Sequence, residues 1–151
     1  MKILKYIFYS FLFLISFSTK AQNLSINSLI KLNELNIAES ENFLSKYKWT
    51  YVESFDKDGH TYLTFDYIEN NKLIGEISKT YNNSTNFVGL SFYNRNKKNT
   101  YIQELIKLGF KKTNLFVDGE RIVEEYSKGI LNVSIYTRPN NKFFISVNKN
   151  N

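Results

Sequence analysis

Residues 60–81, HTYLTFDYIENNKLIGEISKTY, decide how this chain folds. Leu63 and Phe65 alternate with polar residues, which is the two-residue period of a strand with one buried face. Two asparagines at 70–71 separate this run from a second alternating run at 73–81, and such a pair indicates a tight hairpin turn. The stretch therefore predicts an antiparallel hairpin with one apolar and one polar face.

The flanking sequence extends this hairpin into a helical segment followed by four strands. Helices are predicted at 28–35, from Leu29, Leu32 and Leu35, and at 39–48, from Phe43, Leu44 and Tyr47. Asn36 with Glu39 is a capping box at the start of the second helix. Strands are predicted at 49–55, 61–68, 73–81 and 87–93, joined by turns at Asp58-Gly59, Asn70-Asn71 and Asn82-Asn83-Ser84.

The same order of elements recurs in the second half of the chain. Thr100 to Gln103 is a predicted capping box, with Ile102, Leu105 and Ile106 as the apolar stripe of its helix. Gly109 is expected to end that helix. Strands are predicted at 110–117, 121–126, 130–137 and 142–148, with a hairpin turn at Asp118-Gly119.

Four pairs of positions relate the two halves: Trp49 with Phe110, Phe55 with Phe116, Asp58-Gly59 with Asp118-Gly119, and Phe87-Val88 with Phe143-Phe144. We interpret them as a duplication, giving units of about 28–94 and 95–151, and a chance succession in an ordinary α+β protein is the alternative. Units of about 60 residues without disulfides or metal are marginal alone. We therefore predict an α+β fold in which two helix-plus-four-stranded antiparallel units pack as one domain, 22–151.

The sheet face opposite the helices is expected to be exposed. Its predicted polar residues are Thr64, Asp66, Glu76, Ser78, Asn132 and Ser134. The layout is similar to that of the tandem-repeat beta-lactamase inhibitor proteins, in which two helix-plus-four-strand units form a concave binding surface. The resemblance implies binding of another protein.

The first 21 residues have the order of a secretory signal peptide. Lys2 and Lys5 precede an apolar run at 6–17, and small residues end at Ala21, where we place cleavage. The run is shorter than the ~20 residues of a spanning helix, although a short uncleaved anchor is the alternative. The leader resembles those of small exported proteins of AT-rich Gram-negative bacteria, so we expect a periplasmic or secreted protein.

The composition excludes much chemistry. The chain has no Cys and one His, which excludes disulfides, thiolate metal sites and multi-histidine sites. We therefore expect no cofactor, no metal and no catalytic residue. Residues 54–60, SFDKDGH, resemble a calcium loop, but Phe65 stands where its closing Glu belongs, and a polar turn is preferred.

One histidine and two pairs of carboxylates are the remaining candidates for acid–base chemistry. His60 lacks an evident nucleophile, and an exposed turn residue is the preferred interpretation. Asp66 and Glu76 lie on neighbouring predicted strands, where a carboxylate-only hydrolase would need them, although two solvated surface acids are preferred. Glu124 and Glu125 are adjacent in a strand and so point to opposite faces.

Charge is divided between the two halves. Removing three leader lysines from 20 basic residues leaves 17 against 14 acids, a net charge of +3. Residues 22–94 carry 6 bases and 9 acids, and residues 95–151 carry 11 bases and 5 acids. The predicted patch for an anionic partner comprises Tyr93, Arg95, Lys97, Lys98, Tyr101, Lys107, Lys111 and Lys112. A solvated helix rim is the alternative.

These observations predict an exported, non-catalytic binding module of the cell envelope that binds or inhibits another protein. The alternative is a binder of an anionic polymer or lipid surface through the basic patch, and the second alternative is the hydrolase. Trp49 is expected in the core, as is its counterpart Phe110.

Overall fold

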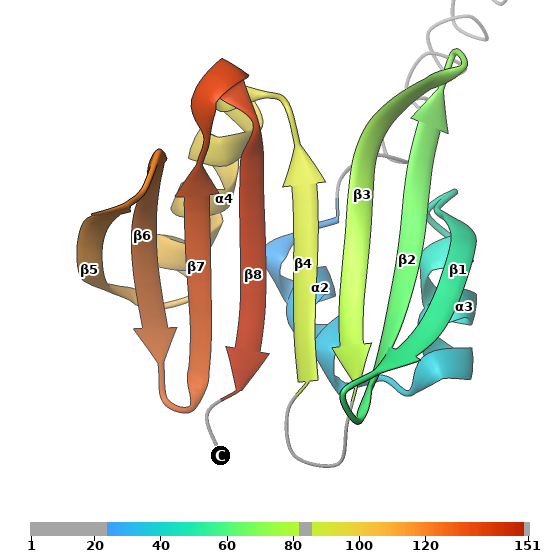
Figure 1. The fold of residues 1–151 in the computed structure, drawn as a ribbon. Helices are drawn as coiled ribbons and strands as arrows, with labels where there is room; N and C mark the ends of the chain where they lie inside the picture. Colours follow the sequence, from blue (N-terminus) through green and yellow to red (C-terminus); the bar gives the residue numbers. More distant parts are fainter. Residues whose placement is uncertain (1–23, 82–85, 150–151) are drawn as a thin grey trace, which may run out of the picture.

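The computed structural model describes residues 24–81 and 86–149 (Figure 1). The helical elements are α2 (Ile26–Glu34), α3 (Ile37–Ser45), α4 (Arg95–Lys107) and the 3₁₀ turn η1 (Pro139–Asn141). The strands are β1 (Thr50–Lys57), β2 (His60–Glu69), β3 (Lys72–Tyr81), β4 (Asn86–Phe92), β5 (Lys111–Asp118), β6 (Arg121–Lys128), β7 (Leu131–Thr137) and β8 (Phe143–Lys149).

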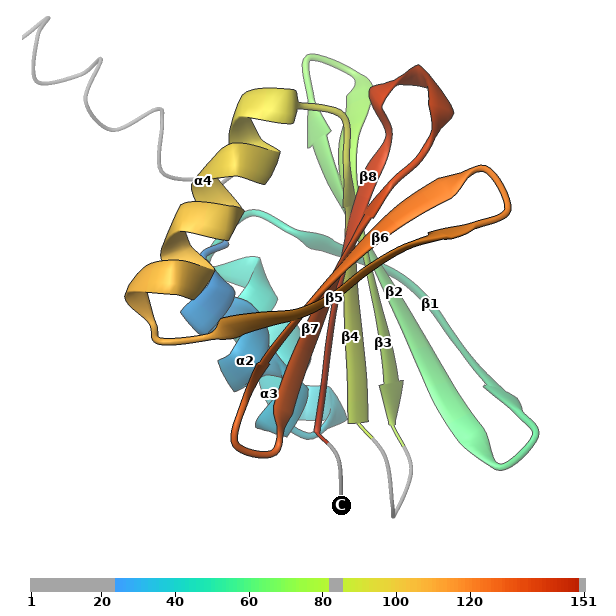
Figure 2. The same ribbon diagram turned by 90° about the vertical axis from the view of Figure 1, so that its left-hand side faces the viewer.

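All eight strands form one antiparallel sheet in the order β1-β2-β3-β4-β8-β7-β6-β5. The α+β class with antiparallel strands is confirmed. β4 pairs with β8, so the last described strand lies in the middle of the sheet, as Figure 1 shows. The three α-helices lie on one side of the sheet, and the tips of the β1–β2 and β5–β6 hairpins curve away to the other side (Figure 2).

The helix ends follow from local side-chain chemistry. The Asn36 side chain accepts a hydrogen bond from Glu39 N, and Glu39 Oε2 accepts one from Asn36 N, both at 3.0 Å, which confirms the predicted capping box. Lys48, the second residue after the C-cap of α3, and Gly109, the first after the C-cap of α4, have positive φ of 62° and 83°. Gly109 therefore ends α4 as predicted, since glycine adopts this conformation without steric cost.

The predicted start of the third helix at Thr100 is wrong. α4 begins at Arg95, capped by Asn94, whose side chain accepts from Lys97 N at 3.1 Å. Thr100 lies inside the helix, and its hydroxyl donates to the Asn96 carbonyl. The buried stripe also differs from the prediction, because Tyr101 and Leu105 are buried whereas Ile106 is 56% exposed.

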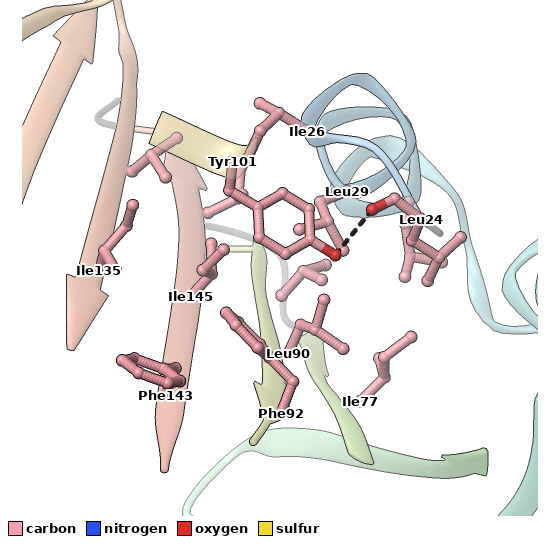
Figure 3. Close-up of a cluster of buried hydrophobic side chains, with 14 of the residues drawn as sticks. Leu24, Ile26, Leu29, Ile77, Leu90, Phe92, Tyr101, Ile135, Phe143 and Ile145 are labelled. Atoms are coloured by element: carbon pink, nitrogen blue, oxygen red, sulfur yellow. Dashed lines mark hydrogen bonds between the residues drawn. The ribbon is translucent and has the colours of Figure 1, made fainter. Parts of the chain in front are cut away.

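One hydrophobic core lies between the helices and the sheet. α2 packs over β4 and β8 at the centre, placing Leu29 against the strands that join the two halves of the sheet. The Tyr101 hydroxyl donates to the Leu24 carbonyl at 2.9 Å, tying α4 to the residues that precede α2 (Figure 3). Burial raises the pKa of Tyr101 and the nearby Glu104 raises it further, so this donor stays protonated. Trp49 and Phe110 are both buried in the core, as predicted.

The two outer hairpins have the same strand register at an offset of 61 residues. Tyr51 pairs with Phe65 and Lys112 with Tyr126. Each pair is followed by a bulge that leaves one residue of the edge strand unpaired, Val52 in β1 and Thr113 in β5. The ends of α3 and α4 match as well, because Trp49 N donates to the Leu44 carbonyl and Phe110 N to the Leu105 carbonyl.

Two of the predicted equivalences are wrong in detail. Asp58 and Gly59 both have positive φ and form the turn between β1 and β2. In the other hairpin Asp118 is the last residue of β5, so the turn is Gly119-Glu120 and Gly119 takes the place of Asp58.

The predicted equivalence of Phe87-Val88 with Phe143-Phe144 is also wrong, because it matches residues that lie on opposite faces of the sheet. Val88 and Phe143 are buried under the helices, whereas Phe87 and Phe144 are partly exposed on the other face. One residue of shift reverses every side chain of a strand, so this correspondence placed the two strands one position out of step.

The predicted leader, its cleavage after Ala21 and the turn at Asn82-Asn83-Ser84 lie outside the described residues. Within 24–81 and 86–149, no helix has the length and apolar character needed to cross a membrane.

Candidate binding surface

The side of the sheet opposite the helices, which we call the open face, is covered by none of the helices of residues 24–81 and 86–149 (Figure 2). The register places all six predicted polar residues on it, since Asp66 pairs with Glu76, Thr64 with Ser78, Ser134 with Ser146 and Asn132 with Asn148. Leu63, Phe65 and Ile77, which alternate with them, are buried beneath the helices.

A band of small hydroxyl side chains crosses the middle of the open face. Successive cross-strand partners run from Thr64 through Ser78, Gly89 and Ser146 to Ser134, which joins five neighbouring strands. Ser146 in the middle of the band is buried, whereas Thr64, Ser78 and Ser134 are partly exposed. A partner would therefore meet hydroxyl groups from several neighbouring strands.

Aromatic side chains lie on both sides of this band. Phe144 is the centre of one group, with ring centroids 6.1 Å from Phe87 and 5.6 Å from Tyr136. A Cβ atom at Gly89 would overlap the Phe144 ring and lie 2.9 Å from Ser78 Oγ, so the ring occupies the space that glycine leaves. Phe55 and Tyr62 form a second, stacked pair at 5.0 Å. The sequence pattern had not identified these aromatic residues as a surface feature.

Four carboxylates of the open face have no side-chain partner among the described residues: Glu53, Asp66, Glu76 and Glu125. Asp66 and Glu76 lie directly opposite each other on β2 and β3. Like charges in this position destabilise a strand pair, so their presence needs a reason outside the hairpin. Neither residue lines the pocket described below.

The predicted turn at residues 54–60 is present, and one of its carboxylates is bonded internally. The Thr61 hydroxyl donates to Asp56 Oδ1 at 2.7 Å. His60 begins β2, and its ring lies 6.2 Å from that of Tyr62. In the part of the chain that the structure describes, no group of three or more His, Cys, Asp or Glu residues could hold a metal ion.

The structure divides the predicted basic patch. Tyr101 lies in the core at 2% exposure and does not reach the surface. Tyr93, Arg95 and Lys97 lie at the first turn of α4. Lys107 and Lys111 lie at its other end, about 20 Å away along a helix of this length.

Lys98 and Lys112, the remaining two residues of the patch, share one carboxylate, that of Glu124. Lys98 Nζ lies 2.7 Å from Glu124 Oε1, and Lys112 Nζ lies 2.8 Å from Oε2. Burial alone would raise the pKa of Glu124, but hydrogen bonds and attraction from the two lysines outweigh it and hold the pKa below its usual value. The group holds α4 to β6, so it is structural.

A pocket of about 350 Å³ lies at the first turn of α4. Its lining is Lys72, Leu73, Ile74, Phe92, Tyr93, Asn94 and Lys97. Burial lowers the pKa of Lys97, whose Nζ lies 5.9 Å from the Phe92 ring centroid. Lys142 Nζ lies 5.7 Å from the centroid of Tyr93, so a third cation borders the pocket.

Lys79 is one of the buried polar residues that sequence reasoning missed. It is fully buried on the helix side of β3. Its ammonium donates to the carbonyls of Leu32 and Leu35 at the end of α2, and to Ser40 Oγ at 3.1 Å. The alternation of β3 was the available signal, since Gly75, Ile77 and Lys79 fall on one face.

Comparison of this chain with protein-family models, curated proteins and solved structures gives no match.

Proposed function

We propose that this chain is an exported, non-catalytic binding protein whose open face binds another protein. The observation that carries the proposal is the uncovered sheet face with aromatic groups around a band of hydroxyls. Aromatic residues supply most of the energy of protein interfaces, and lysine is depleted from the centres of such interfaces. The centre of the open face has this composition.

The unpaired carboxylates narrow the chemistry of the partner. Glu53, Asp66, Glu76 and Glu125 give the open face four negative charges that form no ion pair among the described residues. A partner with lysine or arginine around an apolar centre would remove the repulsion between Asp66 and Glu76. We therefore expect a partner with a basic binding segment.

Affinity capture from the envelope fraction of the native organism tests this proposal. We expect wild-type protein to retain a specific partner and the Asp66→Lys/Glu76→Lys variant to lose it. Glu41→Lys/Glu34→Lys, with the same change of charge on the helix side, is the matched control and should retain the partner. Retention of the partner by the open-face variant, or failure of the wild type to retain any protein, would contradict the proposal.

We also propose that the domain arose by duplication of a unit that corresponds to about 28–94 and 95–151. The shared 61-residue offset supports this, because it covers the hairpin register, the bulge and the end of the preceding helix. Bulges are specific features of a strand pair, and two unrelated hairpins have no reason to place them identically. α2 has no counterpart in the second unit and covers the junction at β4 and β8.

Export is part of the proposal and is tested separately. The full chain expressed in a Gram-negative host should be recovered outside the cytoplasm with Gln22 as its N-terminal residue. Mass spectrometry of the purified protein measures this. Recovery of an intact chain that starts at Met1 would overturn the proposed cleavage.

The second candidate function is binding of an anionic lipid or polymer at the first turn of α4. The pocket between Lys72 and Lys97, with Tyr93 and Lys142 at its border, favours it. Binding to phosphatidylglycerol vesicles or to a polyanion should then weaken steeply with salt and with Lys72→Glu/Arg95→Glu. Lys107→Glu/Lys111→Glu, at the far end of α4, should change it little. Equal effects of the two double variants would contradict a localised site.

A further inference from the structure

Three aliphatic residues are exposed on the outermost hairpin of the second half. Leu115, Val117 and Ile122 are 58%, 71% and 47% exposed, and we call them the aliphatic cluster. They lie on the helix side of the sheet, because Val117 pairs with Ile122, and Leu115 pairs with Glu124, whose carboxylate contacts α4. The cluster is therefore separate from the open face.

The other outer hairpin is an internal control for this cluster. At the 61-residue offset the corresponding residues are Ser54, Asp56 and Thr61, and Thr61 donates to Asp56 at 2.7 Å. The two hairpins share register and bulge, so this geometry folds well with polar side chains there. The exposed aliphatic residues of β5 and β6 are not needed to build the hairpin.

The aliphatic cluster borders a free backbone edge. β5 is the last strand in the sheet order, and among the eight described strands it pairs with β6 alone. Asp118 and Arg121 flank a two-residue turn and form a hydrogen-bonded pair, so the alternate residues Leu115 and Val117 direct their backbone groups outward. An exposed apolar edge strand is a template for another strand, and proteins usually protect such an edge with charge.

We propose that β5 pairs antiparallel with β5 of a second copy of this chain, which joins two eight-stranded sheets into one. Leu115 and Phe116 lie near the middle of the strand, so a two-fold axis there brings the two aliphatic clusters together. Lys111 and Lys112 lie at one end of β5 and Asp118 at the other. Antiparallel pairing sets the basic end of each strand beside the acidic end of its mate.

Pairing of β5 with β1 of another copy is the competing arrangement. It would place the aliphatic cluster against Ser54 and Asp56, which leaves apolar side chains beside polar ones. It would also repeat from copy to copy without closing, whereas the β5–β5 pair closes as a dimer. The match of apolar surface therefore selects the β5–β5 pair.

Sedimentation measurements on the purified protein test the proposal. A single strand pair buries less than a standard interface of about 1,600 Å², so the dimer is expected to be weak. The protein is therefore measured at concentrations from about 1 to about 200 µM. We expect a monomer–dimer equilibrium. Leu115→Lys should weaken dimerisation at least about tenfold, because it places like charges at the two-fold axis. Ser54→Lys, the equivalent change in β1, should leave it unchanged. A monomer throughout this range, or equal weakening by Ser54→Lys, would overturn the proposal.

A second measurement identifies the interface directly. The chain has no cysteine, so a single Leu115→Cys residue is the only thiol present. Hydrogen-bonded residues that face each other across an antiparallel pair have Cα atoms about 5.5 Å apart, within the range of a disulfide. Mild oxidation should give a covalent dimer with Leu115→Cys and not with Ser54→Cys. Circular dichroism confirms that each variant is folded, and failure of a folded Leu115→Cys variant to cross-link more than the control would contradict the interface.

Discussion

A single buried lysine connects three elements of the first half. The side chain of Lys79 extends from β3 to the C-terminal end of α2, where the last carbonyl groups of the helix carry partial negative charge. It also contacts Ser40 of α3, whose hydroxyl donates to the Asn36 carbonyl at 2.6 Å. Burial lowers the pKa of Lys79 to about 8, and attraction by Glu39 opposes this only in part.

This pKa makes stability depend on pH in a defined direction. Between about pH 8 and pH 10.5 the unfolded chain binds a proton at Lys79 that the folded chain does not, so the free energy of unfolding rises with pH. The gain approaches about 3 kcal/mol over that range and is absent in Lys79→Met. Urea unfolding of both proteins at pH 7.5 and pH 9.5 measures the difference, in which the other titrating groups cancel.

Lys72→Met is the control, because Lys72 is exposed at the other end of β3. Its unfolding free energy should change with pH in parallel with that of the wild type. If the curve of Lys79→Met also ran parallel to the wild type, the buried ammonium would not be the cause.

Gly89 is a position on the open face that has no room for a side chain. Gly89→Ala places a methyl group against the Phe144 ring, and we expect a loss of about 1–3 kcal/mol in unfolding free energy. Phe144→Leu should itself destabilise the protein but should reduce the cost of Gly89→Ala. Thermal or urea unfolding of the two single variants and the double variant gives the coupling energy. Additive losses would show that the ring does not set the cost.

At the scale of elements, the two predicted capping boxes give opposite expectations. Asn36→Ala removes a side-chain acceptor at the start of α3 and should cost about 1 kcal/mol. Thr100→Ala lies at an exposed position inside α4, so it should be neutral or slightly stabilising, since alanine has the higher helix propensity. Chemical denaturation of the two variants measures both effects. A comparable loss of stability in Thr100→Ala would indicate that the Thr100 side chain caps the start of a helix, as the sequence predicted.

The sequence predicts the strands well because alternation is strong, and each of the eight predicted strands overlaps an observed one. It predicts the start of α4 poorly for a physical reason. Residues 95–100, RNKKNT, carry no apolar residue, and they contact the rest of the protein through the long side chains of Lys97 and Lys98. A hydrophobic pattern does not detect a helical turn that packs through lysine stems.

The open face was predictable in part. Its polar residues follow directly from alternation, whereas the group around Phe144 depends on which strands become neighbours. Phe87 and Phe144 meet only because β4 pairs with β8 across more than fifty residues of chain. The division of the basic patch depends on tertiary structure as well, since nothing local to Lys98 or Lys112 indicates that both contact Glu124.

At the scale of the whole molecule, the two halves depend on each other. β4 and β8 are each paired on both sides, and α2 from the first half covers β8 from the second. Residues 22–94 and 95–151 should therefore be unfolded when expressed separately and should regain structure when mixed. Near-ultraviolet circular dichroism and gel filtration measure this. Cooperative unfolding of either fragment alone would contradict the prediction.

The central place of β8 also determines when the fold can be completed. Until residues 143–149 are available, β4 lacks its second neighbouring strand, and α2 lacks β8, one of the two strands on which it packs. A chain that emerges N-terminus first therefore keeps its central strands incompletely paired until residues 143–149 have emerged. If the chain is exported, as proposed, this late pairing delays the completion of the fold.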